Sequence, residues 1–143
     1  MERGTTRARL DPDTGDRFVP LRRQLGVTTF GINQIVLQPG QRGRIHRHGR
    51  QEEVYIVLEG QLALVVEGEE LTLRTGEMVR IAPDLRRQLI NRGPGRLLVL
   101  ALGGKGEHHG RDGEAFISWD DEAGSSPQDI PLPPDLDANE LRS

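Results

Sequence analysis

The stretch Gly40 to Gly60, GQRGRIHRHGRQEEVYIVLEG, decides the fold and carries the candidate site. His46 and His48 stand two residues apart, so on a strand both imidazole rings project from one face, with Cα atoms about 6 to 7 Å apart. Glu53 follows a polar turn and opens an apolar run, so it can return on the neighbouring strand. Imidazole nitrogens and a carboxylate oxygen are ligands that divalent transition metals accept. We therefore predict a metal site formed by His46, His48 and Glu53.

The spacing of this stretch resembles the first motif of the cupin superfamily. The motif reads Gly40, five residues, His46, one residue, His48, four residues, Glu53, six residues and Gly60. The six-residue interval selects Glu53 over its neighbour Glu52, and on a strand the two side chains point to opposite faces.

A degraded second cupin motif follows at GEMVRIAPDLRRQLIN, Gly76 to Asn91. Asp84 takes the place of the usual glycine, and Arg87 stands where cupins carry their third histidine. The resemblance covers residues 18 to 103. It implies a small single-domain cupin with a divalent Mn, Fe, Ni, Cu or Zn ion as cofactor and a small molecule as ligand.

The composition favours an all-β chain of one domain. Its 143 residues suffice for a single core, and short apolar runs recur between glycine- and proline-containing turns. Together with the resemblance, this predicts a double-stranded β-helix, the jelly-roll β-barrel of cupins, with extended N- and C-terminal arms. We expect an irregular N-terminal lead at residues 1–15, the cupin barrel at 16–103, and a glycine-rich loop with an acidic Pro/Ser-rich tail at 104–143.

Strands and few helices are expected along the chain, with one weak helical turn at Asp135–Arg142. The predicted strands are Arg17–Arg23, Thr28–Leu37, Arg44–His48, Glu53–Glu59, Gln61–Glu67, Glu70–Arg74, Met78–Ile81, Arg87–Asn91 and Arg96–Leu102. Leu62–Val66 and Leu97–Leu102 are apolar on both faces, which indicates that the outside of the barrel is also covered, by a second sheet or another subunit.

Charge and residue counts exclude several functions. The chain has no cysteine, so disulfides and thiolate chemistry are absent. The net charge is −3, but residues from 120 onward carry −6, which leaves the first 119 residues at +3. The basic residues form no stripe with interleaved aromatics, so we expect no nucleic-acid binding. Without a signal peptide or an apolar run near 18 residues, we expect no membrane association and a cytoplasmic location.

Arg87 leaves three arrangements open. It pairs with Glu53 in a metal-free pocket; it swings to the barrel mouth and leaves a site of two histidines and one carboxylate; or the register of the strand turns Gln88 inward as a weak fourth ligand. Beside a metal, Arg87 is a candidate for holding a substrate carboxylate or phosphate by a bidentate pair, and without a metal it is a candidate for holding an anionic ligand in the same pocket. Gln88 and Tyr55 are the other possible substrate-binding residues.

Other candidate residues are assigned by their place in the pattern. Tyr55 shares the parity of Glu53 and is expected to line the pocket, where core packing is the competing role. Gln34 and Val36 are expected to face inward from the opposing strand. His108 and His109 lie on a glycine-rich loop, where histidines are usually solvated and a lid or ligand role is the alternative.

Two functions remain open, because a jelly roll does not by itself specify a reaction. The first is a metal-dependent cupin enzyme that acts on a small polar molecule, of dioxygenase, isomerase or cyclase type, with no catalytic residue assigned. The second is a metal-free binding or sensing module in which Arg87 holds an anion. Small chains that resemble cupins are commonly dimers, so we also expect a homodimer.

Overall fold

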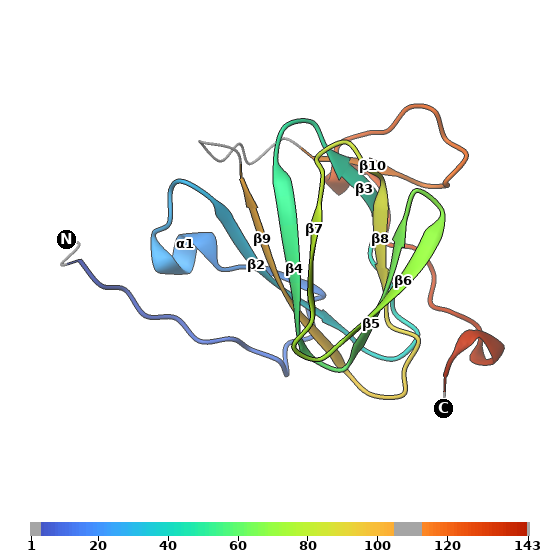
Figure 1. The fold of residues 1–143 in the computed structure, drawn as a ribbon, viewed down its shortest axis with the longest axis horizontal. Helices are drawn as coiled ribbons and strands as arrows, with labels where there is room; N and C mark the ends of the chain where they lie inside the picture. The colour runs from blue at the N-terminus through green and yellow to red at the C-terminus, as the bar shows by residue number, and fades with distance from the viewer. Residues whose placement is uncertain (1–3, 105–112, 143) are drawn as a thin grey trace.

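Two antiparallel sheets face each other and enclose the core (Figure 1). The structure is a computed structural model, and it describes residues 4–104 and 113–142. The first sheet has the strand order β1-β2-β9-β4-β7 and the second β10-β3-β8-β5-β6. The strands are β1 Phe18–Pro20, β2 Gly31–Leu37, β3 Ile45–His48, β4 Glu52–Glu59, β5 Gln61–Val66, β6 Glu69–Arg74, β7 Met78–Ile81, β8 Arg87–Ile90, β9 Leu97–Gly104 and β10 Gly113–Phe116. The predicted all-β class and jelly-roll arrangement are confirmed.

Helices are few and short, as expected. They are α1 Arg22–Leu25 and two 3₁₀ turns, η1 Pro127–Asp129 and η2 Ala138–Glu140. Within the described ranges, no helix has the length and apolarity needed to cross a membrane. The strand expected at Arg17–Arg23 is wrong in its second half, because the chain leaves β1 after Pro20 and enters α1, which ends at Gly26 in the left-handed conformation.

Strict alternation along β4 places the candidate ligand inside the barrel. Glu53, Tyr55 and Val57 are buried, while the side chains between them lie on the outer face. On the paired strand β9, Val99 and Ala101 share the inner face. The main apolar core consists of Leu37, Tyr55, Val57, Leu62, Leu64, Leu73, Ile81, Leu89, Leu97, Val99 and Ala101. Glu53 is thus a charged residue at the margin of an apolar interior.

The C-terminal tail covers the outside of the second sheet. Leu136 packs against Ala63 and Ile90, and its backbone N–H donates to the carbonyl of Gly40 at 2.7 Å. Arginines of the barrel hold the tail along its length: Arg17 to Asp135, Arg42 to the carbonyl of Pro134 and Arg44 to that of Ile130. The apolar outer face of β5 is therefore covered by the chain's own tail.

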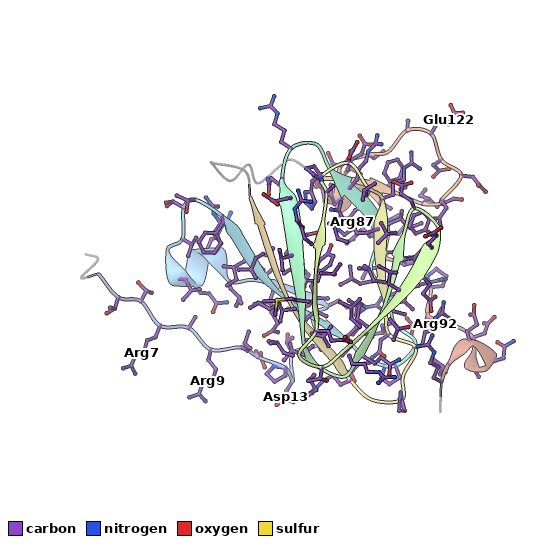
Figure 2. All side chains as sticks on the ribbon, viewed as in Figure 1. Arg7, Arg9, Asp13, Arg87, Arg92 and Glu122 are labelled. Carbon is purple, nitrogen blue, oxygen red and sulfur yellow. The ribbon has the colours of Figure 1, made fainter. Side chains whose placement is uncertain are left out.

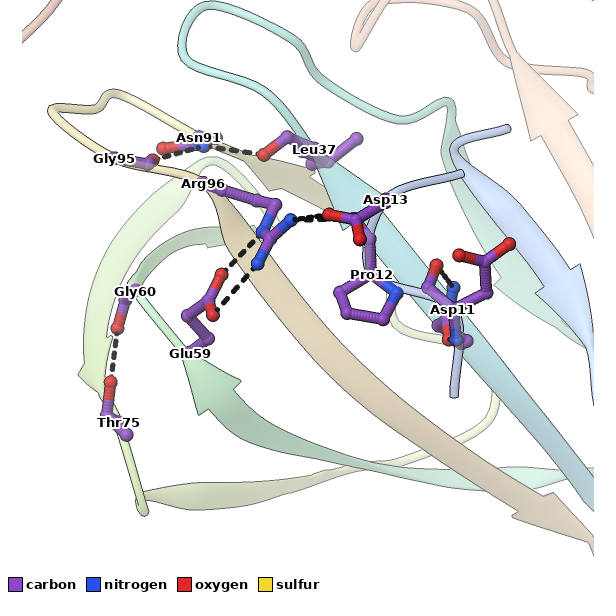
Figure 3. Close-up of polar contacts among 11 residues, drawn as sticks. Asp11, Pro12, Asp13, Leu37, Glu59, Gly60, Thr75, Asn91, Gly95 and Arg96 are labelled. Atoms are coloured by element: carbon purple, nitrogen blue, oxygen red, sulfur yellow. Dashed lines mark hydrogen bonds and ion pairs between the residues drawn. The ribbon is translucent and has the colours of Figure 1, made fainter. Parts of the chain in front are cut away.

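The N-terminal segment covers part of the first sheet. The side-chain amide of Gln34 exchanges hydrogen bonds with the backbone of Asp11, at 2.6 and 2.7 Å. Arg96 binds both Glu59 and Asp13 (Figure 3). The expectation that Gln34 and Val36 face inward is wrong, because Ile35 and Leu37 are the residues of β2 in the core. Gln34 and Val36 are buried under the N-terminal segment instead. Because both faces of β2 are covered, the sequence pattern does not show which of its residues face the core.

The second sheet also uses a strand beyond the 16–103 segment predicted for the barrel. β10 pairs with β3 so that Ala115 lies opposite His46 and Gly113 opposite His48. This pairing places the strand that carries both histidines between β10 and β8.

Candidate metal centre

Strands of both sheets bring the candidate ligands together at one end of the barrel. His46 and His48 come from β3 in the second sheet, and Glu53 comes from β4 in the first. A tight connection at residues 49–51 joins the two strands, so it turns the chain from one sheet to the other. The site therefore spans the space between the sheets.

The three side chains converge on a common point. His46 Nε2 lies 3.7 Å from Glu53 Oε1, and His48 Nε2 lies 3.6 Å from Glu53 Oε2. The imidazole rings meet edge to face with centroids 5.5 Å apart. Their side chains retain 24% and 19% exposure, against 11% for Glu53. The two histidines are therefore the more exposed side of the site.

Tyr55 lies behind the carboxylate and is only 1% exposed. Its hydroxyl donates a hydrogen bond to Glu53 Oε1 and lies 3.4 Å from His46 Nε2. Burial, followed by the nearby Glu53 charge, raises the pKa of Tyr55 well above its ordinary value, so the hydroxyl keeps its proton. Tyr55 thus packs in the apolar core and holds Glu53 from that side.

Arg87 lies on the inner face of β8, as Leu89 does, and the register of β3 with β8 places it opposite His46. Figure 2 labels Arg87 among the strands of the barrel. Its side chain is 0% exposed. Nη1 and Nη2 donate to the carbonyls of Pro83 and Ala82, both at 3.2 Å, and Nε lies 3.8 Å from Glu53 Oε1 without a hydrogen-bond partner. Arg87 therefore does not swing to the mouth. Two of the five N–H donors of its guanidinium therefore bind the backbone of the preceding turn.

The charge of Glu53 is secured by its neighbours. Burial alone raises the pKa of this carboxyl, but hydrogen bonds and charge interactions with His46 and His48 outweigh it and hold the pKa well below its usual range. Glu53 is therefore a carboxylate near neutral pH, the form that binds a cation.

The remaining candidates lie apart from this group. Gln88 projects from the opposite face of β8 and donates to the carbonyl of Gly43 at 3.0 Å, so the register that turns Gln88 inward is not adopted. Glu52 points outward and pairs with Arg80 at 2.5 Å. His108 and His109 lie outside the described residues. The backbone carbonyls that hold Arg87 were not anticipated, since nothing in the sequence marks them.

The donor set fits a divalent transition metal. Ions of this kind bind nitrogen and oxygen at about 2.0 to 2.2 Å, so two ligands of one ion stand at most about 4.4 Å apart. One ligand atom from each of the three residues lies within 4.8 Å of the others, and both histidine–glutamate pairs already satisfy the limit. The ligands would be His46, His48 and Glu53.

Comparison with known proteins gives a consistent result. Residues 33–103 match the family model described as Cupin domain. A crystal structure of a cupin protein from Bacteroides fragilis superposes with a TM-score of 0.64 at 25% identity, covering 73% of this chain and 86% of that chain.

Two curated relatives come from streptomycetes. The tetracenomycin polyketide synthase protein TcmJ of Streptomyces glaucescens is 30% identical over 90 residues, 63% of this chain and 54% of that protein. Polyketide synthase CurC of Streptomyces cyaneus is 32% identical over 69 residues, 48% of this chain and 45% of that protein. The chain spans about half the length of these relatives.

Proposed function

This chain belongs to the cupin superfamily, and from that premise we propose that it is a metal-dependent protein that acts on a small polar molecule. His46, His48 and Glu53 hold the ion. The observation that carries the proposal is their convergence within 4.8 Å from strands of two facing sheets. A divalent ion held there supplies Lewis-acid polarisation of an oxygen atom that it binds.

The residues around the ligands have roles of their own. Tyr55 holds Oε1 of Glu53 from the core, which limits the rotation of the carboxylate. His46 and His48 form the exposed edge, along which a small molecule enters. The names of the two curated relatives, both polyketide synthase proteins, favour a polyketide as that molecule.

Metal loading tests this proposal. Tag-free protein is incubated in turn with Mn, Fe, Co, Ni, Cu and Zn salts and dialysed, and we expect about one equivalent of at least one metal to remain. A variant with His46→Ala and His48→Ala should lose it. A matched variant with His108→Ala and His109→Ala controls for metal held by other histidines. Retention that is equal in wild type and in the His46/His48 variant refutes the metal site.

A metal-free binding role is the second candidate, favoured by the 3.8 Å approach of Arg87 to Glu53. The guanidinium there stands beside the carboxylate in the manner of a buried ion pair, which removes the need for a metal to balance Glu53. Absence of bound metal, together with thermal stabilisation of the metal-free protein by carboxylates or phosphates, supports this candidate over the first.

We further propose that the protein is a homodimer joined through the outer face of the first sheet. This face carries the half-buried Val54, Ile56 and Leu100 and the exposed Met78, whereas the outer face of β5 in the second sheet is covered by the tail. The exposed pair Glu52 and Arg80 on the same face can be exchanged between two copies about a two-fold axis.

The N-terminal arm gives the proposed dimer a second contact. Residues 4–9 are exposed and run away from the body of the barrel, with Arg7 and Arg9 on the arm (Figures 1 and 2). Light scattering after size exclusion should give twice the mass of 15.9 kDa. Ile56→Glu should give the monomer mass, whereas Leu71→Glu, at an exposed position on β6 of the second sheet, should not. A monomeric wild type refutes the dimer.

A further inference from the structure

The charge of Arg87 is the feature of the site that the metal ligands leave unexplained. The guanidinium is fully buried, and its terminal nitrogens bind two uncharged carbonyls. Among the described residues, the only carboxylate that forms an ion pair with Arg87 is that of Glu53, whose Oε1 lies 3.8 Å from Nε, beyond hydrogen-bond distance. Nε is buried without a hydrogen-bond partner. A buried cation with such incomplete compensation is costly unless a further negative charge comes near it.

The charge balance of the metal-loaded site is a second reason to expect a negatively charged group near Arg87. Glu53 and Arg87 cancel, and the two imidazoles bind metal in their neutral form. A divalent ion therefore leaves the site with a charge of about +2, whereas a neutral side chain at position 87 would leave about +1. Because Arg87 is 0% exposed, water and salt screen this extra charge only weakly.

We propose that Arg87 makes this centre selective for small molecules that bring negatively charged oxygen atoms, such as a carboxylate, an enolate or a phosphate. The inference rests on the metal site proposed above and names the class of ligand that the site takes. Such a ligand offsets the charge of the loaded site, and a neutral molecule of the same shape does not.

Arg87 exerts this selectivity by its charge and not by gripping the ligand. Its terminal nitrogens are engaged with Ala82 and Pro83, and the accessible edge of the site is formed by His46 and His48. The ligand therefore lies on the histidine side while Arg87 stands behind Glu53. It follows that a lysine at position 87 should preserve the selectivity, although it lacks the planar fork that a bidentate grip requires.

Oxalate and oxamide form a matched pair of probes, because they share a shape and differ in charge. Each is titrated into cobalt-loaded protein, and binding is followed by the cobalt absorption bands and by calorimetry. We expect the preference for oxalate over oxamide to fall by about tenfold or more in Arg87→Gln and to stay within about threefold of wild type in Arg87→Lys. Arg80→Gln removes an exposed arginine that is paired with Glu52 and serves as the control, with no expected change.

Each result decides a separate point. Equal preference in wild type and Arg87→Gln overturns the proposal, and a loss in Arg87→Lys as large as in Arg87→Gln overturns the charge mechanism in favour of direct contact. Wild type that retains no cobalt or other metal refutes the proposed function at the loading step, before any anion is added, and the inference falls with it. Circular dichroism and melting curves establish folding, and Arg87→Met replaces Arg87→Gln if the latter does not fold.

Discussion

Replacing Arg87 by histidine should raise metal affinity while lowering the stability of the metal-free protein. The side chain stands opposite His46 and 3.8 Å from Glu53, so an ion bound to Glu53 comes within about 6 Å of the guanidinium. At an effective dielectric of 20, one and two unit charges at that distance repel by about 5 kcal/mol. Relaxation of the protein and water at the mouth of the barrel reduce this repulsion. Relief of only a quarter of it in Arg87→His corresponds to about a tenfold gain in metal affinity.

The stability should change in the opposite direction. Arg87→His deprives the carbonyls of Ala82 and Pro83 of their donors and removes the partner of Glu53. Losing buried hydrogen bonds of this kind costs about 1 to 3 kcal/mol. A rise in metal affinity together with a fall in the stability of the metal-free protein therefore separates the electrostatic effect from a general tightening of the fold.

Competition with a chromophoric chelator for zinc or cobalt near pH 7.5 measures the affinity, and urea denaturation of metal-free samples measures the stability. Arg80→His is the matched control, because Arg80 is exposed on the outer face and pairs with Glu52. Affinity that is unchanged or weaker in a folded Arg87→His protein would refute the electrostatic role of Arg87.

Three further predictions concern the scaffold. Leu136→Ala should destabilise the fold by about 2 kcal/mol, seen in urea titrations, because it removes the apolar contact of the tail with the second sheet. The pKa of Glu70 is lowered mainly by its hydrogen bond to Arg92, so its contribution to stability is present above pH 4.5 and is lost as the pH falls; in Arg92→Gln this acid dependence should be weaker. Gly60→Ala should lower the melting temperature, because Gly60 has φ of 85° and an added Cβ would lie 2.3 Å from the Arg96 carbonyl oxygen. An unchanged melting temperature there would contradict the turn geometry.

Local patterns sufficed for most of the strands and for the grouping of the candidate metal ligands. Alternation in β4 put Glu53 and Tyr55 on one face, and the interval between His46 and His48 did the same on β3. Both follow from the two-residue period of a strand, which is a property of the backbone and needs no knowledge of distant contacts. The motif spacing then joined the two strands into one site.

Tertiary structure alone decided what surrounds those ligands. The inward position of Arg87 depends on the register of β8 against β3 and β5, and its engagement with two backbone carbonyls depends on the path of the preceding turn. The motif left the position of Arg87 open among three arrangements, and its bonds to the two carbonyls leave no mark in the sequence, because carbonyl groups are the same in every residue.

The covering of the sheets was equally beyond local patterns. The apolar outer face of β5 signalled that something covers it, but not that Leu136, more than seventy residues away, would do so. β10 joined the barrel beside β3 from beyond the predicted boundary, and Gln34 found its partner in the backbone of Asp11. Periodicity reports that a face is buried, whereas the identity of the group that buries it is a long-range choice made by packing.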